Sequence, residues 1–156
     1  MTMTGRDDDP GVAELIDQVA EAAGAFLRGD VDRYLELVHH AAGFTLTAPD
    51  GGPPAQFADR RSGFEGWQSP FSDGEARLEI TAAHHWDDTV VLVMIERQHG
   101  RVGDLPDRDL SMRVTQVYRR SINGWELVHR HADPLVRPLS LEQMRSLADG
   151  QALPSS

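Results

Sequence analysis

The second half of the sequence alternates apolar and polar residues, and this period of two restricts the fold more than any other feature. The alternation occupies four segments, at residues 75–86, 88–100, 109–121 and 125–132. Successive side chains of a strand point to opposite faces of a sheet, so the pattern predicts four strands. Because the connections between the segments are short, we expect an antiparallel meander.

One of these strands is apolar on both of its faces. The run TVVLVMIE, from Thr89 to Glu96, has no polar side that suits contact with water. Such a strand has to be covered from both sides. The helices of a chain this size can cover only one face of the sheet. We therefore expect a homodimer that buries the other, outer face.

Apolar residues recur at helical spacing in the first forty residues. They predict a helix that begins at Asp9-Pro10, because a capping Asp followed by Pro suits a helix start. Gly29 ends this helix, and Asp30 caps a second, shorter helix that ends near His40. Two helices thus precede the strands.

Between the helices and the meander we expect a short strand at 44–49, a Gly/Pro-rich loop, and one or two helical turns at 64–71 with Trp67 packed inward. After the meander, Ser140 caps a last helix at about 140–149. Runs of helices followed by runs of strands indicate an α+β fold. We expect a single domain over residues 1–156, with its core at about 11–135.

Composition excludes several kinds of chemistry. The chain has no Cys and no Lys, which excludes thiolate nucleophiles, Schiff bases and a lysine-anchored phosphate loop. A formal net charge of −10 opposes nucleic-acid binding. No apolar run reaches the ~18 residues of a membrane span, and the start lacks a signal-peptide core. We expect a cytoplasmic protein without a cofactor.

A row of ionisable residues follows Asn123-Gly124, the preferred dipeptide of a two-residue hairpin turn. If these two residues form the turn, opposed residues have numbers that sum to 247. That arithmetic pairs His129 with Tyr118, His131 with Gln116 and Asp133 with Val114. Opposed side chains share one face of a sheet, so this hairpin predicts a cluster of Gln116, Tyr118, His129, His131 and Asp133.

Three interpretations of this row stay open. It can serve hydrogen bonding or a subunit contact, it can line a pocket for a small molecule, or His129 and His131 can ligate a metal ion. A metal needs three well-placed ligands, so we name no metal ligands. Two further side chains are candidates for a pocket wall. Tyr34 lies on the apolar face of its helix, and Glu96 ends its strand where an ion pair with Arg113 is expected.

Three stretches together resemble the nuclear-transport-factor-2-like superfamily: LRGDVDRYLELV, then FTLTAPDGG, then RVTQVYRRSINGWELVHRHADP. This superfamily includes ketosteroid isomerases, SnoaL-like polyketide cyclases and scytalone dehydratase, and the last hairpin is also similar to the association domain of calcium/calmodulin-dependent kinase II. The resemblance covers about residues 12–135 and is closest to SnoaL-like proteins. It implies a curved antiparallel sheet wrapped around the N-terminal helices, a conical pocket, and dimers through the outer sheet face.

The chain does not have the catalytic residues that steroid isomerisation requires. The isomerase carboxylate would stand at Ala48, its oxyanion tyrosine at Ala22, and its second oxyanion donor at Gln116. Two of these positions hold residues that cannot do the chemistry, so this chain is not expected to be a steroid isomerase. The superfamily's pocket strands do place Gln116 and the His129–Asp133 row on the cavity side.

These features predict a small-molecule-binding protein, and two rival functions follow. As a cofactor-free isomerase, cyclase or dehydratase, the chain would use His131 as acid and base, oriented by Asp133 or Tyr118, with Gln116 donating to an oxyanion. Further pocket residues would be His129, Tyr34, Trp67 and Glu96. As a non-catalytic module, the same fold would bind a ligand or assemble subunits.

Overall fold

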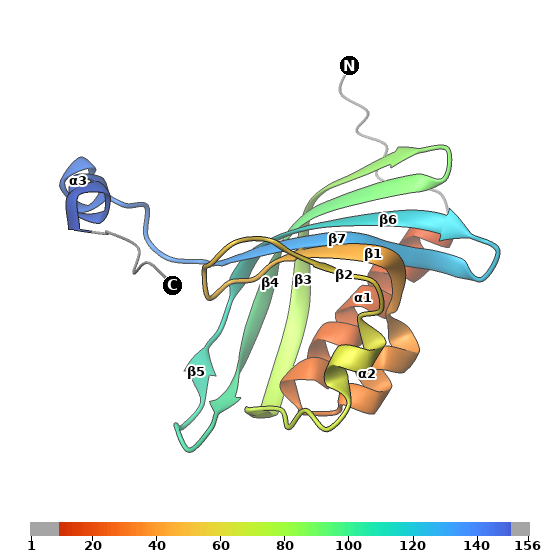
Figure 1. The fold of residues 1–156 in the computed structure, drawn as a ribbon, viewed down its shortest axis with the longest axis horizontal. Coiled ribbons are helices and arrows are strands. Elements are labelled where there is room, and N and C mark those ends of the chain that lie inside the picture. The colour runs from red at the N-terminus through yellow and green to blue at the C-terminus, as the bar shows by residue number, and fades with distance from the viewer. Residues whose placement is uncertain (1–9, 151–156) are drawn as a thin grey trace.

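The computed structural model describes residues 10–150 (Figure 1). The helices are α1 (Pro10–Leu27), α2 (Val31–Leu37), the 3-10 turn η1 (Arg61–Phe64) and α3 (Leu141–Gly150). The strands are β1 (His39–Thr47), β2 (Ala55–Phe57), β3 (Phe71–Trp86), β4 (Thr89–Val102), β5 (Arg108–Asp109), β6 (Met112–Ser121) and β7 (Gly124–Pro134). Asp9, expected to cap α1, lies outside the described residues.

Within the described part of the chain, seven strands form one curved sheet in the order β2-β1-β7-β6-β4-β3, with β5 paired to β4. α1 and α2 lie against one side of this sheet, as Figure 1 shows. The α+β class and the helix-filled cone are thereby confirmed. The sheet is not wholly antiparallel, because β1 runs parallel to β7. β1 pairs with β7, the last strand of the meander, which is distant in the chain. No hairpin connects the two strands, so they are not forced to run antiparallel.

α1 presents its apolar stripe to the concave face of the sheet. Val12, Leu15 and Val19 are almost fully buried, and they pack in one cluster with Leu92 and Met94 of β4. The apolar residues at helical spacing on α1 pack against the apolar residues that alternate along β4, and together they form one core. The predicted helix and the predicted strand are both confirmed.

Two glycines allow the end of α1 to come close to the start of β3. Gly29 has φ +78, and a Cβ there would lie 2.7 Å from the Phe71 carbonyl oxygen. At Gly74, a Cβ would lie 2.5 Å from Cβ of Leu27. Neither site has room for a side chain. This contact holds α1 across the concave face.

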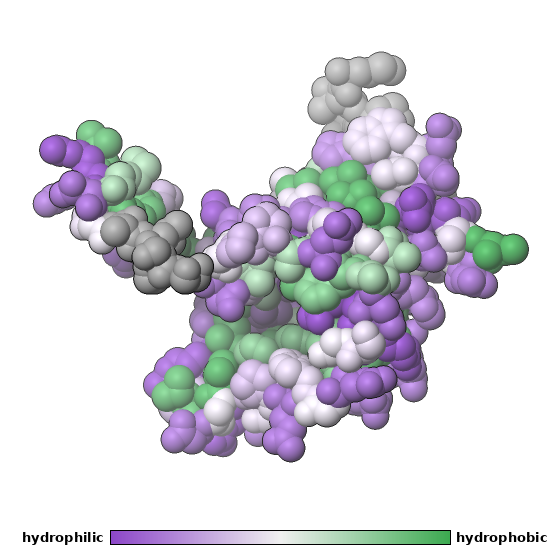
Figure 2. All heavy atoms as spheres, viewed as in Figure 1, coloured by the Kyte–Doolittle hydropathy of each residue, from purple (hydrophilic) through white to green (hydrophobic). Residues whose placement is uncertain are grey.

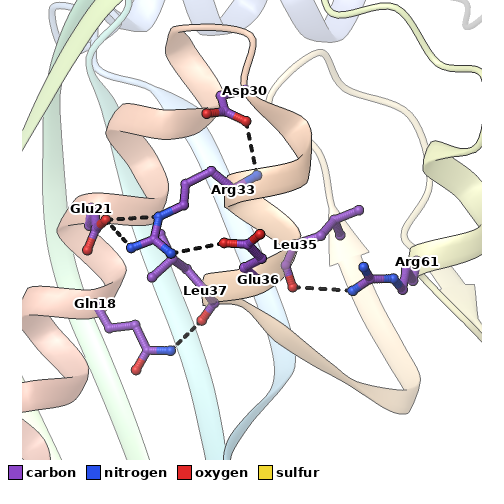
Figure 3. Close-up of polar contacts among 8 residues, drawn as sticks. All are labelled: Gln18, Glu21, Asp30, Arg33, Leu35, Glu36, Leu37 and Arg61. Atoms are coloured by element: carbon purple, nitrogen blue, oxygen red, sulfur yellow. Dashed lines mark hydrogen bonds and ion pairs between the residues drawn. The ribbon is translucent and has the colours of Figure 1, made fainter.

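Polar contacts join α2 to α1 (Figure 3). The Asp30 side chain accepts a hydrogen bond from the Arg33 backbone at 3.0 Å, which confirms Asp30 as the N-cap. The Arg33 guanidinium bridges Glu21 of α1 and Glu36 of α2. Gln18 of α1 donates to the carbonyl of Leu37, where α2 ends. α2 ends earlier than expected because the chain turns into β1 at His39.

The segment between β1 and β3 differs most from the expected structure. Its Gly/Pro-rich loop contains a short strand, β2, which pairs with β1. The helical turns expected at 64–71 are wrong, because the 3-10 turn η1 ends at Phe64, residues 65–70 are not helical, and Phe71 already belongs to β3. Trp67 stacks on Phe26 with ring centroids 5.8 Å apart, but 38% of its surface stays exposed. Trp67 is therefore packed on one side only.

The doubly apolar strand β4 has one covered and one uncovered face. Val90, Leu92 and Met94 face the helices and are buried. Val91, Val93 and Ile95 alternate with them and are only partly buried. The chain itself thus supplies one of the two covers that the sequence requires. No helix among the described residues has the length and apolar character needed to cross a membrane.

Candidate functional site

The hairpin between β6 and β7 decides which polar residues reach the inside of the cone. Its two-residue loop is Ile122-Asn123, one position earlier than expected, and Ser121 pairs with Gly124. The Ser121 hydroxyl donates to the Gly124 carbonyl and accepts from the Asn123 amide, which fixes the turn there. A turn that begins one position earlier still leaves His129 on the same face of the sheet as Tyr118.

A β-bulge then reverses the face of the polar row. Tyr118 pairs with Leu127, but its neighbour Val117 pairs with His129, so Val128 is an extra residue in β7. One extra residue turns every following side chain to the other face of the sheet. From His129 onward, the odd-numbered residues of β7 therefore face outward.

The expected pairs of His131 with Gln116 and of His129 with Tyr118 are therefore wrong. His131 pairs with Thr115 on the outer face, where 47% of its side chain is exposed. Asp133 accepts from Arg113 at 3.1 Å and lies 3.3 Å from His131. His129 contacts the Thr45 hydroxyl at 2.7 Å. These contacts match the first of the three interpretations, hydrogen bonding on a strand.

The same bulge brings Arg130 to the inner face. Its guanidinium donates two hydrogen bonds to the Glu96 carboxylate, at 2.7 and 2.9 Å. The Glu96 side chain is 3% exposed and that of Arg130 is 18% exposed. Burial acts to lower the pKa of Arg130, but the charge and hydrogen bonds of Glu96 raise it above its ordinary value. The expected partner of Glu96, Arg113, is wrong, because Arg113 points to the outer face.

Two tyrosines lie beside this ion pair. The Tyr118 hydroxyl donates to the Gln116 side-chain oxygen at 2.8 Å, and both side chains are buried. Burial raises the pKa of Tyr118 and of Tyr34, so both phenols stay protonated at any physiological pH. The positive charge of Arg130 lies close enough to both phenols to oppose this rise in pKa, but burial outweighs it.

His40 completes the arrangement and was not among the expected site residues. Its Nε2 lies 3.3 Å from the Tyr34 hydroxyl, and its ring packs against Phe44. Burial, followed by the charge of Arg60, lowers the pKa of His40 to about 4, so the imidazole is neutral at pH 7. One feature of the sequence could have indicated this position. Adjacent residues on a strand point to opposite faces, so one of His39 and His40 has to face the inside of the sheet.

We call these six side chains the inner polar cluster: Tyr34, His40, Glu96, Gln116, Tyr118 and Arg130. They come from α2, β1, β4, β6 and β7, so only the folded chain brings them together. The sequence had named four of them, the exceptions being His40 and Arg130. Among the described residues, no group of three or more His, Asp or Glu side chains is arranged to hold a metal ion.

Aromatic side chains surround the cluster on its helix side. Trp67 contacts both Phe26 and Phe64, and Tyr34 contacts the same two rings. The Arg60 guanidinium lies 4.2 Å above the centre of the Phe64 ring. An open hollow of about 800 Å³ lies outside this wall, between the α1–α2 junction and residues 59–71. Trp67 lines that hollow rather than the inner polar cluster.

The other end of the cone is incompletely filled. Leu78, Glu96, Met112 and Pro134 stand opposite one another on β3, β4, β6 and β7, and we call this row the open end. Leu78 and Met112 are only partly buried. Figure 2 shows the surface hollowed beside the end of β7, with hydrophobic residues in the hollow. The inner polar cluster begins at this row, with Glu96.

These contacts define what the cluster can do chemically. Arg130 supplies a permanent positive charge in a mostly apolar environment, and the Gln116 amide nitrogen supplies hydrogen-bond donors, whereas the Tyr118 hydroxyl already donates to the Gln116 oxygen. Glu96 is occupied by Arg130, so it is not a free base. His40 is the neutral imidazole of the cluster, able to accept a proton. The arrangement suits an oxygen that carries negative charge.

Comparison with known proteins places this fold in a family. The family model described as SnoaL-like domain matches residues 12–136. The chain belongs to the SnoaL-like domain family. The expected SnoaL-like membership is confirmed by this match, and solved structures described as NTF2-like share the fold. No curated protein matches the sequence.

Solved structures share the fold of this SnoaL-like domain at low sequence identity. A proposed dehydratase of the NTF2-like family from Streptomyces avermitilis is 18% identical over 81% of this chain and 95% of its own, with a TM-score of 0.62. The CaMKII hub of S. rosetta is 22% identical over 83% and 98%, with a TM-score of 0.63. A proposed aromatic ring hydroxylase from Novosphingobium aromaticivorans is 21% identical over 83% and 90%, with a TM-score of 0.62. These likenesses establish the fold alone.

Proposed function

We propose that this SnoaL-like domain binds a small organic molecule inside the cone, at the inner polar cluster. The observation that carries the proposal is the Arg130–Glu96 pair, which is buried on the concave face among apolar side chains. A buried ion pair is often no more stabilising than apolar residues of the same size. A binding role gives a reason for keeping this charge inside the molecule.

The cluster favours a ligand with a carbonyl or carboxylate oxygen. Arg130 keeps N–H groups beyond those that Glu96 accepts, and its side chain is not fully enclosed. The Gln116 amide nitrogen has no acceptor among the described hydrogen bonds, because only its oxygen is engaged, by Tyr118. These donors come from neighbouring strands, β6 and β7. They would converge on one oxygen of the ligand.

The catalytic form of this proposal is a cofactor-free isomerase, cyclase or dehydratase. His40 replaces His131 as the candidate acid and base, because His40 lies in the cluster and is neutral at pH 7. Tyr34 would hold the imidazole by its hydroxyl. Arg130 and Gln116 would stabilise an enolate oxygen formed when a proton leaves the ligand. The structural likeness to a proposed dehydratase supports this form.

The experiment is a thermal-shift screen with small carboxylates and phenols on three proteins. We expect hits on the wild type that disappear in the Arg130→Met/Glu96→Leu variant, which removes the inner pair without leaving a lone buried charge. The matched control is Arg97→Met/Glu79→Leu, which removes an ion pair of the same type on the outer face. Hits that survive in the inner double variant would place the ligand elsewhere. His40→Gln then tests turnover of any hit.

A second candidate function is self-assembly, and a separate observation favours it. Val91, Val93 and Ile95 of β4 and Val117 of β6 form an apolar strip on the outer face, which a second molecule would cover. Similar folds include a CaMKII hub. We expect a dimer by light scattering at micromolar concentration and a monomer for Val93→Arg. A monomeric mass for the wild type would refute assembly without touching the binding proposal.

A further inference from the structure

The C-terminal arm carries most of the exposed large hydrophobic side chains of the described chain. They are Val136 (67% exposed), Leu139 (45%), Leu141 (70%), Met144 (48%) and Leu147 (43%). The first two belong to the linker after β7, and the other three belong to α3. Large exposed apolar patches in proteins usually mark a surface that is covered by something else.

α3 needs such a cover to remain helical. Leu141, Met144 and Leu147 recur every three residues and form one apolar stripe, while Glu142, Ser146 and Asp149 lie opposite. No residue of α3 is buried, and Figure 1 shows the helix standing away from the sheet. A reciprocal cap between Ser140 and Gln143 fixes its start. Isolated helices of this length are marginal in water, so the stripe has to pack against a partner.

The open end of the cone is the apolar surface nearest to the root of this arm. The Leu135 amide donates to the Ser111 carbonyl at 2.9 Å, which ties the chain to the body next to Pro134. Pro134 itself belongs to the row with Met112, Glu96 and Leu78. The arm therefore leaves the body on the rim of the incompletely filled end, beside the hollow of Figure 2.

The linker is long enough for α3 to reach across that end. Residues 136–140 can span roughly 17 Å when extended. Neighbouring strands lie about 4.8 Å apart, so β3, three strands from β7, is about 14 Å away. A helix of ten residues is about 15 Å long, which matches the width of the row. Reach and size therefore both allow α3 to lie over the row within one molecule.

We propose that α3 packs its stripe of Leu141, Met144 and Leu147 over the open end of its own cone. In this position the stripe covers Leu78 and Met112, and the polar side of α3 faces water. The helix then closes the route from solvent to Glu96 and Arg130. Closure of α3 would thus control entry into the cone, whatever the ligand.

Paramagnetic relaxation tests this placement without a ligand, so its result is independent of the proposed function. The chain has no Cys, so Ser146→Cys takes a single nitroxide label on the side of α3 opposite the stripe. We expect the label to broaden the methyl signals of Leu78 and Met112 in the same molecule. Unchanged methyl signals would show that α3 does not cover the open end, and would overturn the proposal.

Two controls separate this packing from its alternatives. Met144→Ser/Leu147→Ser should abolish the broadening, whereas Glu142→Ser/Asp149→Ser, with the same number of serines on the opposite side, should retain it. A mixture of labelled chains without isotope and unlabelled isotope-enriched chains should show no broadening. Broadening in the mixture would mean that α3 covers a second copy, and the placement within one chain would be wrong.

Discussion

The two faces of this sheet carry similar ion pairs in different environments. Each carries an arginine–glutamate pair that joins strands: Arg130–Glu96 on the inner face and Arg97–Glu79 on the outer face. The inner side chains are 18% and 3% exposed, and the outer ones 39% and 37%. Water screens the outer pair and not the inner one. Position on the sheet, and not residue type, therefore decides which polar group can have a function.

Removal of one inner charge should have the largest effect on stability. Arg130→Met leaves the Glu96 carboxylate buried and unpaired, so we expect a loss of about 3–5 kcal/mol in the free energy of unfolding at pH 7. Urea denaturation measures it. Addition of Glu96→Leu should recover most of this loss. If the single variant were as stable as the wild type, the inner face would be as well solvated as the outer face.

Acid should destabilise the inner face through His40. The unfolded imidazole takes up a proton below pH 6.5, while burial holds the folded pKa at about 4. Stability should therefore fall as the pH drops from 6.5 to 4, by up to about 3 kcal/mol from this group. Urea denaturation of wild type and His40→Gln across this range isolates the contribution. His131→Gln, on the outer face, should follow the wild-type curve; equal curves for all three would refute the difference between the faces.

Hydrogen bonds should differ between the faces in the same direction. Tyr118→Phe removes the donor to the buried Gln116 oxygen, and we expect a loss of about 1–2 kcal/mol. Thr45→Val removes the partner of His129 on the outer face, where water can replace it, and should cost less. Thermal and urea unfolding of the two variants give the comparison. A larger loss for Thr45→Val would contradict it.

The smallest effect should come from the outer ion pair. Arg97→Met removes a side chain that is 39% exposed, so we expect a smaller loss of stability than for any variant above, and one that shrinks further at high salt. The measurement is urea denaturation at low and high ionic strength. A loss as large as that of Arg130→Met would show that the outer face is covered in solution, which would sharpen the case for assembly.

Most of the fold follows from patterns in the sequence. The helical spacing of α1, the caps Asp30 and Ser140, and the alternation of β3, β4, β6 and β7 are local features, and each element forms close to its expected bounds. The short strands β2 and β5 were not expected, because they are held by partners distant in the chain rather than by their own residues. Local patterns do not carry that information.

The candidate site could be predicted only in part. Gln116, Tyr118, Tyr34 and Glu96 meet on the inner face because strand parity and helix spacing place them there. His131, Asp133 and His129 do not join them. The pattern of β7 gives no sign of the bulge, since Val128 fits a regular strand as well as it fits an extra residue.

The sequence alone was enough to predict α1, the four long strands and the need to cover β4 on both faces, because these depend on the spacing of apolar residues along a few turns or strands. Tertiary structure decided which polar residues lie inside. One extra residue at Val128 turns His131 to water and Arg130 into the cone. Arg130 of β7 then reaches Glu96 of β4 across β6, because side chains that point into a concave face converge.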